Sequence, residues 1–351
     1  MSDSTAIRLP DTSRLVVSSS PHYHTRDSVR GIMLWVMAAL LPALAAGVAV
    51  FGWRALYVTL VCMLSCVVFE YASCRLLHHE NSVGDASAAL TGMLLGMNLP
   101  VTAPTWMCVV GSLLAIGLGK MCYGGLGGNP FNPALVGRVA LFLACPKEMS
   151  FWVAPNGCAL GTWVCNTLTG ATPLAVLKTA ATPHAAAASQ GLGDLLPLFL
   201  GNIGGSLGET SALALLIGGA VLIARRIIRW QVPLVYIATV AVVTGIAFLC
   251  QPIANVTLAS YVGHQVLGGG LFLGAFFMAT DMVTTPLSRK GAVVFALGCG
   301  VITSVIRLWG AFPEGVSFSI LIMNTLTPLI DRCTAGRPFG VARTTDVEVK
   351  A

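Results

Sequence analysis

The sequence predicts an all-α polytopic membrane protein with about ten transmembrane helices. Of its 351 residues, 56% are hydrophobic and only 10% are charged, and the mean hydropathy is +0.81. About a quarter of the residues of a soluble domain are usually charged, so this chain has too few charges to cover a soluble surface. Apolar runs long enough to form membrane-spanning helices recur along the sequence. The composition therefore excludes the soluble two-domain protein that the length alone would allow.

The first element is a polar leader, residues 1–30. It contains four arginines but no short apolar core and no cleavage site, so we expect a cytoplasmic segment and not a signal peptide. Ten candidate spans follow, several of them short or interrupted by Gly and Pro. They cover residues 33–52, 55–74, 86–100, 104–119, 131–146, 207–224, 233–250, 265–280, 291–309 and 316–331. A polar tail, residues 336–351, ends the chain.

The basic residues predict how these spans are oriented. If the spans alternate, fifteen of the twenty Lys and Arg residues lie on the side of the N-terminus, and only Arg54, Lys147 and Lys178 lie on the other side. The last two, Arg138 and Arg307, fall within spans. Because Lys and Arg accumulate in cytoplasmic loops, we expect both termini in the cytoplasm. The net charge of +6 then reflects membrane topology and does not indicate a nucleic-acid partner.

Two segments of the first half of the chain have counterparts in the second half. GMLLGMNLPVTAP (92–104) is similar to GAFFMATDMVTTP (274–286), and NPFNPALVGR (129–138) is similar to MNTLTPLIDR (323–332). With five spans in each half, the second half would be inserted upside down, as in many transporters that build a site near the membrane midplane. We therefore predict an inverted 5+5 repeat. Chance similarity between Gly-rich apolar stretches is the alternative.

The membrane domain, residues 31–335, accordingly divides into three parts. Repeat one covers residues 31–146 and repeat two covers residues 207–335. Between them, residues 147–206 form a connection on the extracytoplasmic side in the predicted topology. Connections of this length are usually either functional or disordered.

The segment NTLTGATPL, residues 166–174, stands out in this connection. Gly170 and Ala171 form a small-residue turn that leads to Thr172. Pro173 disfavours a helical conformation at Thr172, so we expect an extended residue with an accessible hydroxyl. From these residues alone, an ordinary turn before a short helix is the simpler interpretation.

The four residues Thr169-Gly170-Ala171-Thr172 resemble the flavinylation site, Ser/Thr-Gly-Ala-Thr, of RnfD in Rnf complexes and of its relative NqrB in the sodium-pumping NADH:quinone reductase. The resemblance implies that a flavin transferase attaches FMN through its phosphate to the hydroxyl of Thr172. The flavin then carries the electrons, and the protein supplies position and electrostatics. Asn166 departs from the family pattern, in which an acidic residue commonly precedes the modified threonine by six positions.

Further similarity to this family extends over roughly residues 30–335. Met282 is an exception within this similarity, because the family has proline at this position. The segments that carry the similarity are 124–138, 201–219, 276–286 and 317–332.

Asn129 and Asn132 belong to the segment NPFNP at the start of the fifth span. Side chains three positions apart share one face of a helix and could bind the edge of a polar ligand. Helix capping by Asn132 before Pro133 is an equally good interpretation. The family resemblance implies that both asparagines lie near a second, non-covalent flavin, which is riboflavin in the quinone-reductase relative.

Acidic residues inside apolar spans are costly and often functional. Glu70 is the deepest of them and is the main candidate for a sodium or proton relay. Asp281 and Asp331, at the cytoplasmic ends of their spans, are further candidates for the ion path. For each, a structural ion pair is the alternative. Glu209, near the start of the sixth span, either meets the helix dipole or helps to bind a flavin or a cation.

Two functions from different classes fit these observations. The first, implied by the resemblance, is a membrane electron-transfer subunit of an Rnf-type complex. Such a complex couples electron transfer between ferredoxin and NAD to sodium or proton translocation. The subunit would lie in the bacterial cytoplasmic (inner) membrane, would require the other membrane and peripheral redox subunits, and would not be active alone. The second is a stand-alone channel or secondary transporter of urea-channel-like architecture. We expect no catalytic side chain. We also expect no metal site, since no CxxC pair occurs.

Overall fold

The fold is all-helical, as the sequence predicts, in the part of the chain that the computed structural model describes. That part comprises residues 28–78, 82–153, 170, 172–180, 195–201, 203–252, 256–310, 312 and 314–335. Most of the leader, the whole of the tail, and Asn166, Thr169 and Ala171 of the flavinylation motif lie outside these residues.

The helices fall into two groups joined by a connection. The first group is α1 (Val29–Phe51), α2 (Trp53–Leu76), α3 (Ser87–Asn98), α4 (Thr105–Gly117), α5 (Pro133–Ala144) and α6 (Pro146–Met149). The connection contains α7 (Pro173–Ala180) and α8 (Leu195–Leu200). The second group is α9 (Ala212–Ala224), α10 (Gln231–Cys250), α11 (Leu258–Leu267), α12 (Leu271–Leu273), α13 (Arg289–Trp309) and α14 (Val316–Thr334). A π-helical segment, Gly274–Met278, continues α12.

Each of the ten expected spans overlaps a helix, but fewer are clear spans by length and composition. In the part of the chain that the structure describes, five helical stretches are long and apolar enough to cross a membrane: α1, α2, Thr105–Tyr123, α10 and α13. A sixth forms if α11 and Leu271–Met278, bent by 56° at their break, count as one span. The chain is thus a polytopic helical membrane protein, with five or six clear spans among its described residues. The eighth span differs from its expected boundary, because helix begins at Leu258 and not at 265.

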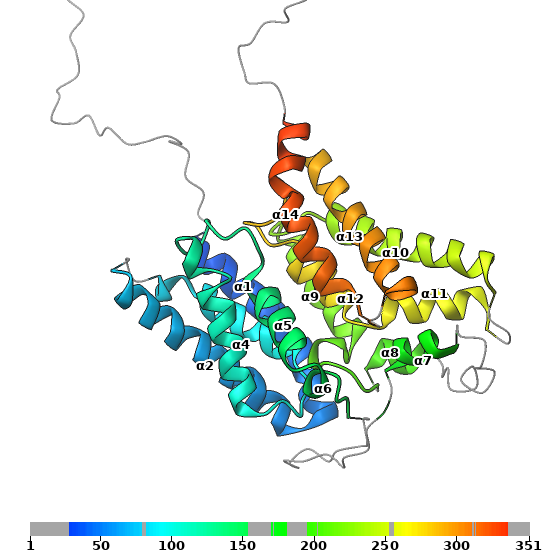
Figure 1. Ribbon diagram of the computed structural model, residues 1–351, viewed down its shortest axis with the longest axis horizontal. Coiled ribbons are helices and arrows are strands. Elements are labelled where there is room, and N and C mark those ends of the chain that lie inside the picture. The colour runs from blue at the N-terminus through cyan, green and yellow to red at the C-terminus, as the bar shows by residue number, and fades with distance from the viewer. Residues whose placement is uncertain are drawn as a thin grey trace, which may run out of the picture.

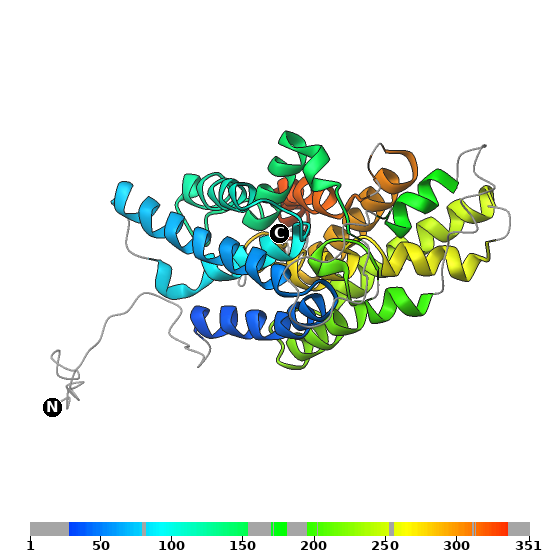
Figure 2. The same cartoon turned by 90° about the horizontal axis from the view of Figure 1, so that it is seen from below.

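The two groups of helices pack in corresponding ways. In the first group, α2 packs on α3 and α4, and α4 packs on α5. In the second group, α10 packs on α11 and α13, and α13 packs on α14. Figure 1 shows the first group on one side of the molecule and α10, α11, α13 and α14 on the other. α1 and α9 lie side by side where the groups meet (Figure 2), and one continuous apolar core extends through both groups.

Glycines allow α3 to approach α2 closely. A Cβ at Gly92 would lie 2.5 Å from the Cα of Met63, and one at Gly96 would lie 2.7 Å from the Cα of Thr59. Small residues four positions apart commonly form such tight contacts between membrane helices. The close contact fixes the position of α3, whose residues form one wall of the pocket described below.

The start of α5 is set by its local sequence. Asn132 caps the helix, since its Oδ1 accepts a hydrogen bond from the backbone N–H of Ala134 at 3.1 Å, and Pro133 occupies the first helical position, which it favours. The capping interpretation of Asn132 is therefore correct. The cap holds the Asn129–Asn132 turn against the end of the π-helical segment, where the Asn132 amide donates to the carbonyl of Met278 at 3.3 Å.

Candidate functional site

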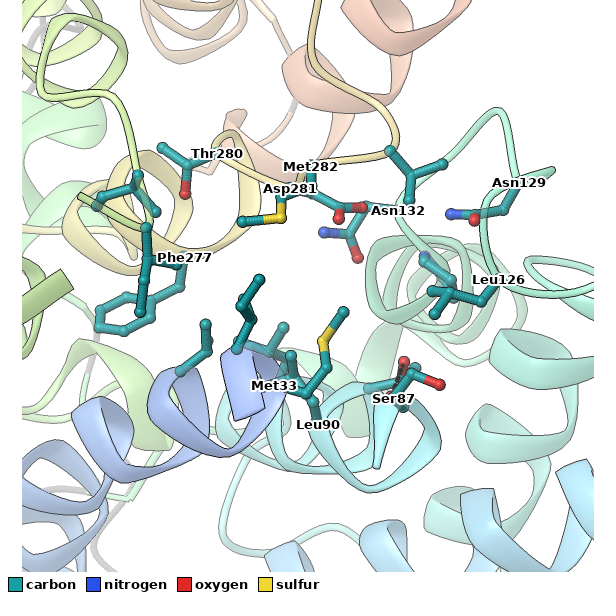
Figure 3. A pocket seen from close by; sticks show the side chains of 18 of the residues that line it. Met33, Ser87, Leu90, Leu126, Asn129, Asn132, Phe277, Thr280, Asp281 and Met282 are labelled. Atoms are coloured by element: carbon teal, nitrogen blue, oxygen red, sulfur yellow. Dashed lines mark hydrogen bonds between the residues drawn. The ribbon is translucent and has the colours of Figure 1, made fainter. Parts of the chain in front are cut away.

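A pocket with a polar edge lies between α1, α3, the start of α5 and the segment after the π-helix. We call it the Asn129 pocket. Figure 3 shows side chains from these elements turned toward one space, including Met33 of α1, Leu90 of α3, and Phe277 and Asp281 of the second group. Its polar lining residues are Ser87, Thr91, Lys120, Asn129, Asn132, Thr280 and Asp281. Apolar walls with a few polar groups at one edge are typical of sites for cofactors and other small molecules.

The two asparagines use their polar atoms differently. Both are buried, at 4% and 3% exposure for Asn129 and Asn132. The cap and the bond to Met278 occupy both ends of the Asn132 amide. The Asn129 amide nitrogen donates to the carbonyl of Phe131 at 3.0 Å, but its Oδ1 has no hydrogen-bond partner among the described protein groups. Buried polar atoms are rarely left unpaired, so Asn129 Oδ1 is the atom of this pocket best suited to accept a hydrogen bond from a ligand.

Beside the pocket, Glu70 forms a buried ion pair with Lys120. The Lys120 ammonium lies 2.6 Å from Glu70 Oε1 and 2.7 Å from the Ser87 hydroxyl. The hydroxyl of Ser82 also donates to Glu70. The side chains of Lys120 and Glu70 are only 1% and 0% exposed. Of the two interpretations of Glu70, the structure thus contains the ion pair, and it places the cationic partner in the lining of the pocket.

Asp281 and Asp331 lie in different surroundings. Asp281 is half-buried and lines the Asn129 pocket, and its Oδ2 accepts a hydrogen bond from Thr284 at 3.3 Å. Asp331 lies on α14, where its Oδ1 accepts from the backbone N–H of Leu287 at 3.0 Å. Asp331 therefore fastens the loop before α13. Of the three expected ion-path acids, Glu70 and Asp281 lie at or beside the pocket, and Asp331 does not line it.

Thr172 lies at the N-terminus of α7 and is 4% exposed, so the expectation of an accessible hydroxyl is wrong for this conformation. The hydroxyl oxygen accepts from the backbone N–H of Ala175 at 3.3 Å and so caps the helix. Burial follows from the apolar face of α7, where Leu174 and Leu177 pack with Phe248 and Tyr261. Of the neighbouring motif residues, only Gly170 is described, and its N–H donates to the carbonyl of Trp152 at 3.2 Å.

Lys120 is the site residue that the sequence did not single out. Its charge is compatible with a cytoplasmic loop, and its carboxylate partner is fifty positions away along the chain. One feature of the sequence does indicate a buried lysine. Lys120 stands between an apolar span and the segment MCYGG, without the run of polar residues that is usual in a loop.

One family model and several known proteins are similar to this chain over most of its length. A sequence model of the NQR2, RnfD, RnfE family matches residues 16–340. The D subunit of an ion-translocating oxidoreductase complex from Stutzerimonas stutzeri is 45% identical over 343 residues, which cover 90% of this chain and 93% of that protein. Two relatives are named as D subunits of Na(+)-translocating and proton-translocating ferredoxin:NAD(+) oxidoreductase complexes. The first, from Acetobacterium woodii, is 44% identical over 94% of this chain and 96% of its own length. The second, from Clostridium ljungdahlii, is 43% identical over 93% and 96%. The chain therefore belongs to the NQR2, RnfD, RnfE family.

Proposed function

We propose that this chain is the membrane electron-transfer subunit of an Rnf-type complex, which couples electron transfer between ferredoxin and NAD to the translocation of sodium ions or protons. The observation that carries the proposal is the family match over residues 16–340 together with Thr-Gly-Ala-Thr at 169–172. The chain acts with the other membrane and peripheral subunits of its complex and not alone. A stand-alone channel would have no use for a flavin attachment motif.

The first flavin site of this proposal is Thr172, with FMN joined to its hydroxyl through a phosphoester. Its position supports this, because a negatively charged phosphate is favoured at the N-terminus of a helix such as α7. The 4% exposure of Thr172 implies that a flavin transferase acts before α7 docks on α10 and α11. Thr169, Gly170 and Ala171 would form the rest of the recognition motif.

The second site is the Asn129 pocket, which would hold a non-covalent flavin such as riboflavin. Such a flavin supplies one- and two-electron transfer chemistry when bound. In support, Asn129 Oδ1 is buried without a partner in the described protein, and Phe276 and Phe277 provide apolar walls. Asn129 would orient the ring edge, and Lys120 would counter negative charge on it. Asn132 would hold the pocket together through its bond to Met278.

The architecture in this proposal is ten spans in an inverted 5+5 repeat, with both termini in the cytoplasm and the connection 147–206 on the extracytoplasmic face of the bacterial inner membrane. The matched packing supports it, because α2 contacts α3 and α4 much as α10 contacts α11 and α13. Ion movement would use acids near the pocket, Glu70 and Asp281, with Asp331 at the cytoplasmic end.

The test is in-gel ultraviolet fluorescence of the denatured chain, produced with its partner subunits and its flavin transferase. The wild-type band should fluoresce, Thr172→Ala should be dark, and Thr172→Ser should retain fluorescence because it keeps a hydroxyl. Thr325→Ala, at an exposed threonine of α14 outside the motif, is the matched control and should fluoresce like the wild type. A dark wild-type band would contradict covalent attachment, and a colourless purified complex would favour the channel.

A further inference from the structure

A second buried charge cluster lies away from the Asn129 pocket, where α5 meets the turns before α9 and α14. Its centre is Arg138 of α5. One guanidinium nitrogen, Nη2, lies 2.5 Å from Glu314 Oε2 and 3.9 Å from Glu209 Oε1. The other, Nη1, donates to Asn98 Oδ1 at 2.6 Å. One arginine thus stands between two carboxyl groups and pairs closely with only one of them.

The carboxyl group that lacks the close partner is the more deeply buried one. The Glu209 side chain is 3% exposed, whereas that of Glu314 is 17% exposed. Glu209 Oε1 forms no hydrogen bond with any described group, and the backbone at Gly270 closes over it, since a Cβ there would lie 3.3 Å away. Ionisation is unfavourable for a buried carboxyl group with an unpaired oxygen, whereas the protonated form carries no charge to desolvate.

The remaining charges around Glu209 do not remove this requirement. Arg307 of α13 is a further cation beside this turn, since a Cβ at Gly269 would lie 2.7 Å from its Nη2. Its guanidinium donates to the carbonyls of Gln265, Gly268 and Gly269 at the end of α11. Four helices pack around the turn that carries Glu209: α1, α3, α9 and α12. None of them contains Asp, Glu, Lys or His. Arg138 and Glu314 are therefore the charged groups that decide the state of Glu209.

We propose that Glu209 is a proton-binding site, which holds a proton while Arg138 pairs with Glu314 and releases it when Arg138 turns to Glu209. In the second state the proton passes from the Glu209 carboxyl to water, and the carboxylate that remains pairs with the guanidinium. Closing the 3.9 Å separation to an ordinary N–H···O distance of about 2.9 Å requires a movement of about 1 Å. A metal cation fits less well, because it needs several oxygen ligands and Arg138 already provides a positive charge at this point.

A route for the proton begins at the same residues. Arg138 and Glu314 line a small cleft with Phe142, Ser317 and Phe318, whose free volume is about 20 Å³, enough to admit about one water molecule. Phe142, Phe312 and Phe318 form an aromatic group at this cleft. On the other side, Asn98 links Arg138 toward Met278, and Met278 accepts from Asn132 of the Asn129 pocket.

The connection that would carry FMN also contacts the partner of Arg138. The Lys178 ammonium, on α7, donates to the carbonyls of Gly310 and Phe312 at 2.5 and 2.8 Å. These carbonyls belong to the loop that carries Glu314. A shift of α7 would therefore move Glu314 relative to Arg138. This coupling rests on the proposed function, whereas the protonation of Glu209 does not.

Infrared difference spectroscopy of the purified complex, titrated with acid and base, tests the protonation. The wild type should show a protonated-carboxyl band that moves in D2O. Glu209→Gln should lose this band, Glu209→Asp should keep it at a shifted frequency, and Glu148→Gln, at an exposed glutamate of α6, should leave it unchanged. If Glu209→Gln does not assemble, the shift in Glu209→Asp alone decides.

A band that is identical in Glu209→Gln or Glu209→Asp would overturn the proposal, and so would a Glu209 carboxylate signal that responds to sodium and not to pH. The Thr172→Ala complex should retain the band, so that a failure of covalent flavinylation remains distinguishable. In proteoliposomes, the Glu209→Gln complex should transfer electrons without translocating ions. Full translocation by that variant would exclude Glu209 from the ion path.

Discussion

Replacing Lys120 with methionine should destabilise the protein by about 3–5 kcal/mol, the usual cost of removing one partner of a buried ion pair. The substitution removes the cation 2.6 Å from Glu70 and leaves that carboxylate at 0% exposure. The Ser87 hydroxyl loses its donor at the same time. Such a loss corresponds to a roughly 10²- to 10⁴-fold change in the unfolding equilibrium. Methionine has a similar volume, so little of the effect should come from a cavity.

Reversible unfolding of the purified full-length chain in mixed micelles, titrated with a denaturing detergent, measures this change. Lys290→Met, at an exposed lysine at the start of α13, is the matched control and should change stability by less than about 0.5 kcal/mol. The double variant Lys120→Met/Glu70→Leu should lose less than Lys120→Met alone, because no charge remains buried. A loss below about 1 kcal/mol in Lys120→Met would refute the reasoning, because unpaired buried charges cost more than that.

Three further predictions follow from other contacts. Gly92→Ala should lower the unfolding free energy by about 1–3 kcal/mol, because its Cβ would lie 2.5 Å from Met63 Cα; Gly84→Ala, with nothing within 4 Å, should leave the same unfolding curve unchanged. Asn129→Ala should weaken retention of non-covalent flavin about 5- to 10-fold, the worth of one hydrogen bond, and equal retention on gel filtration would argue against that contact. Burial lowers the pKa of Lys178 from its ordinary value of 10.5, so the unfolded chain binds more protons between the two values and stability should rise with pH there. Lys178→Met should abolish this rise in thermal melts, and an unchanged slope would count against it.

Much of the helical framework could be predicted from hydropathy, since burial in a bilayer leaves long apolar runs in the sequence. The cap at Asn132 was also predictable, because Asn before Pro at a helix start is a local signal. The beginning of α11 was not. Its polar residues Ser260, His264 and Gln265 interrupt the apolar run, yet His264 lies within the helix at 1% exposure and bonds to the carbonyl of Ser260 at 2.7 Å.

The polar contacts of the site could not be predicted because they join distant parts of the chain. Arg138 meets Glu314 across 176 positions and Asn98 across 40, and no periodicity in the sequence encodes such pairs. The burial of Thr172 was missed for a related reason. Its motif predicts a turn, but its exposure depends on how the apolar face of α7 packs on Phe248 and Tyr261.

The Asn129 pocket and the cleft beside Glu314 lie close together along α5, and this spacing bears on the membrane voltage. Asn132 and Pro133 line the Asn129 pocket, whereas Arg138, Val139 and Phe142 line the cleft beside Glu314. Six residues of helix rise only about 9 Å, against roughly 30 Å for the hydrocarbon of a bilayer. In the proposed topology, with polar groups reaching both ends of this stretch, the membrane potential would fall mainly across it, with a field about three times that of a uniform bilayer. A charge that crossed this part of α5 would then perform most of its work against the membrane voltage, about 2.3 kcal/mol per 100 mV, within two helical turns.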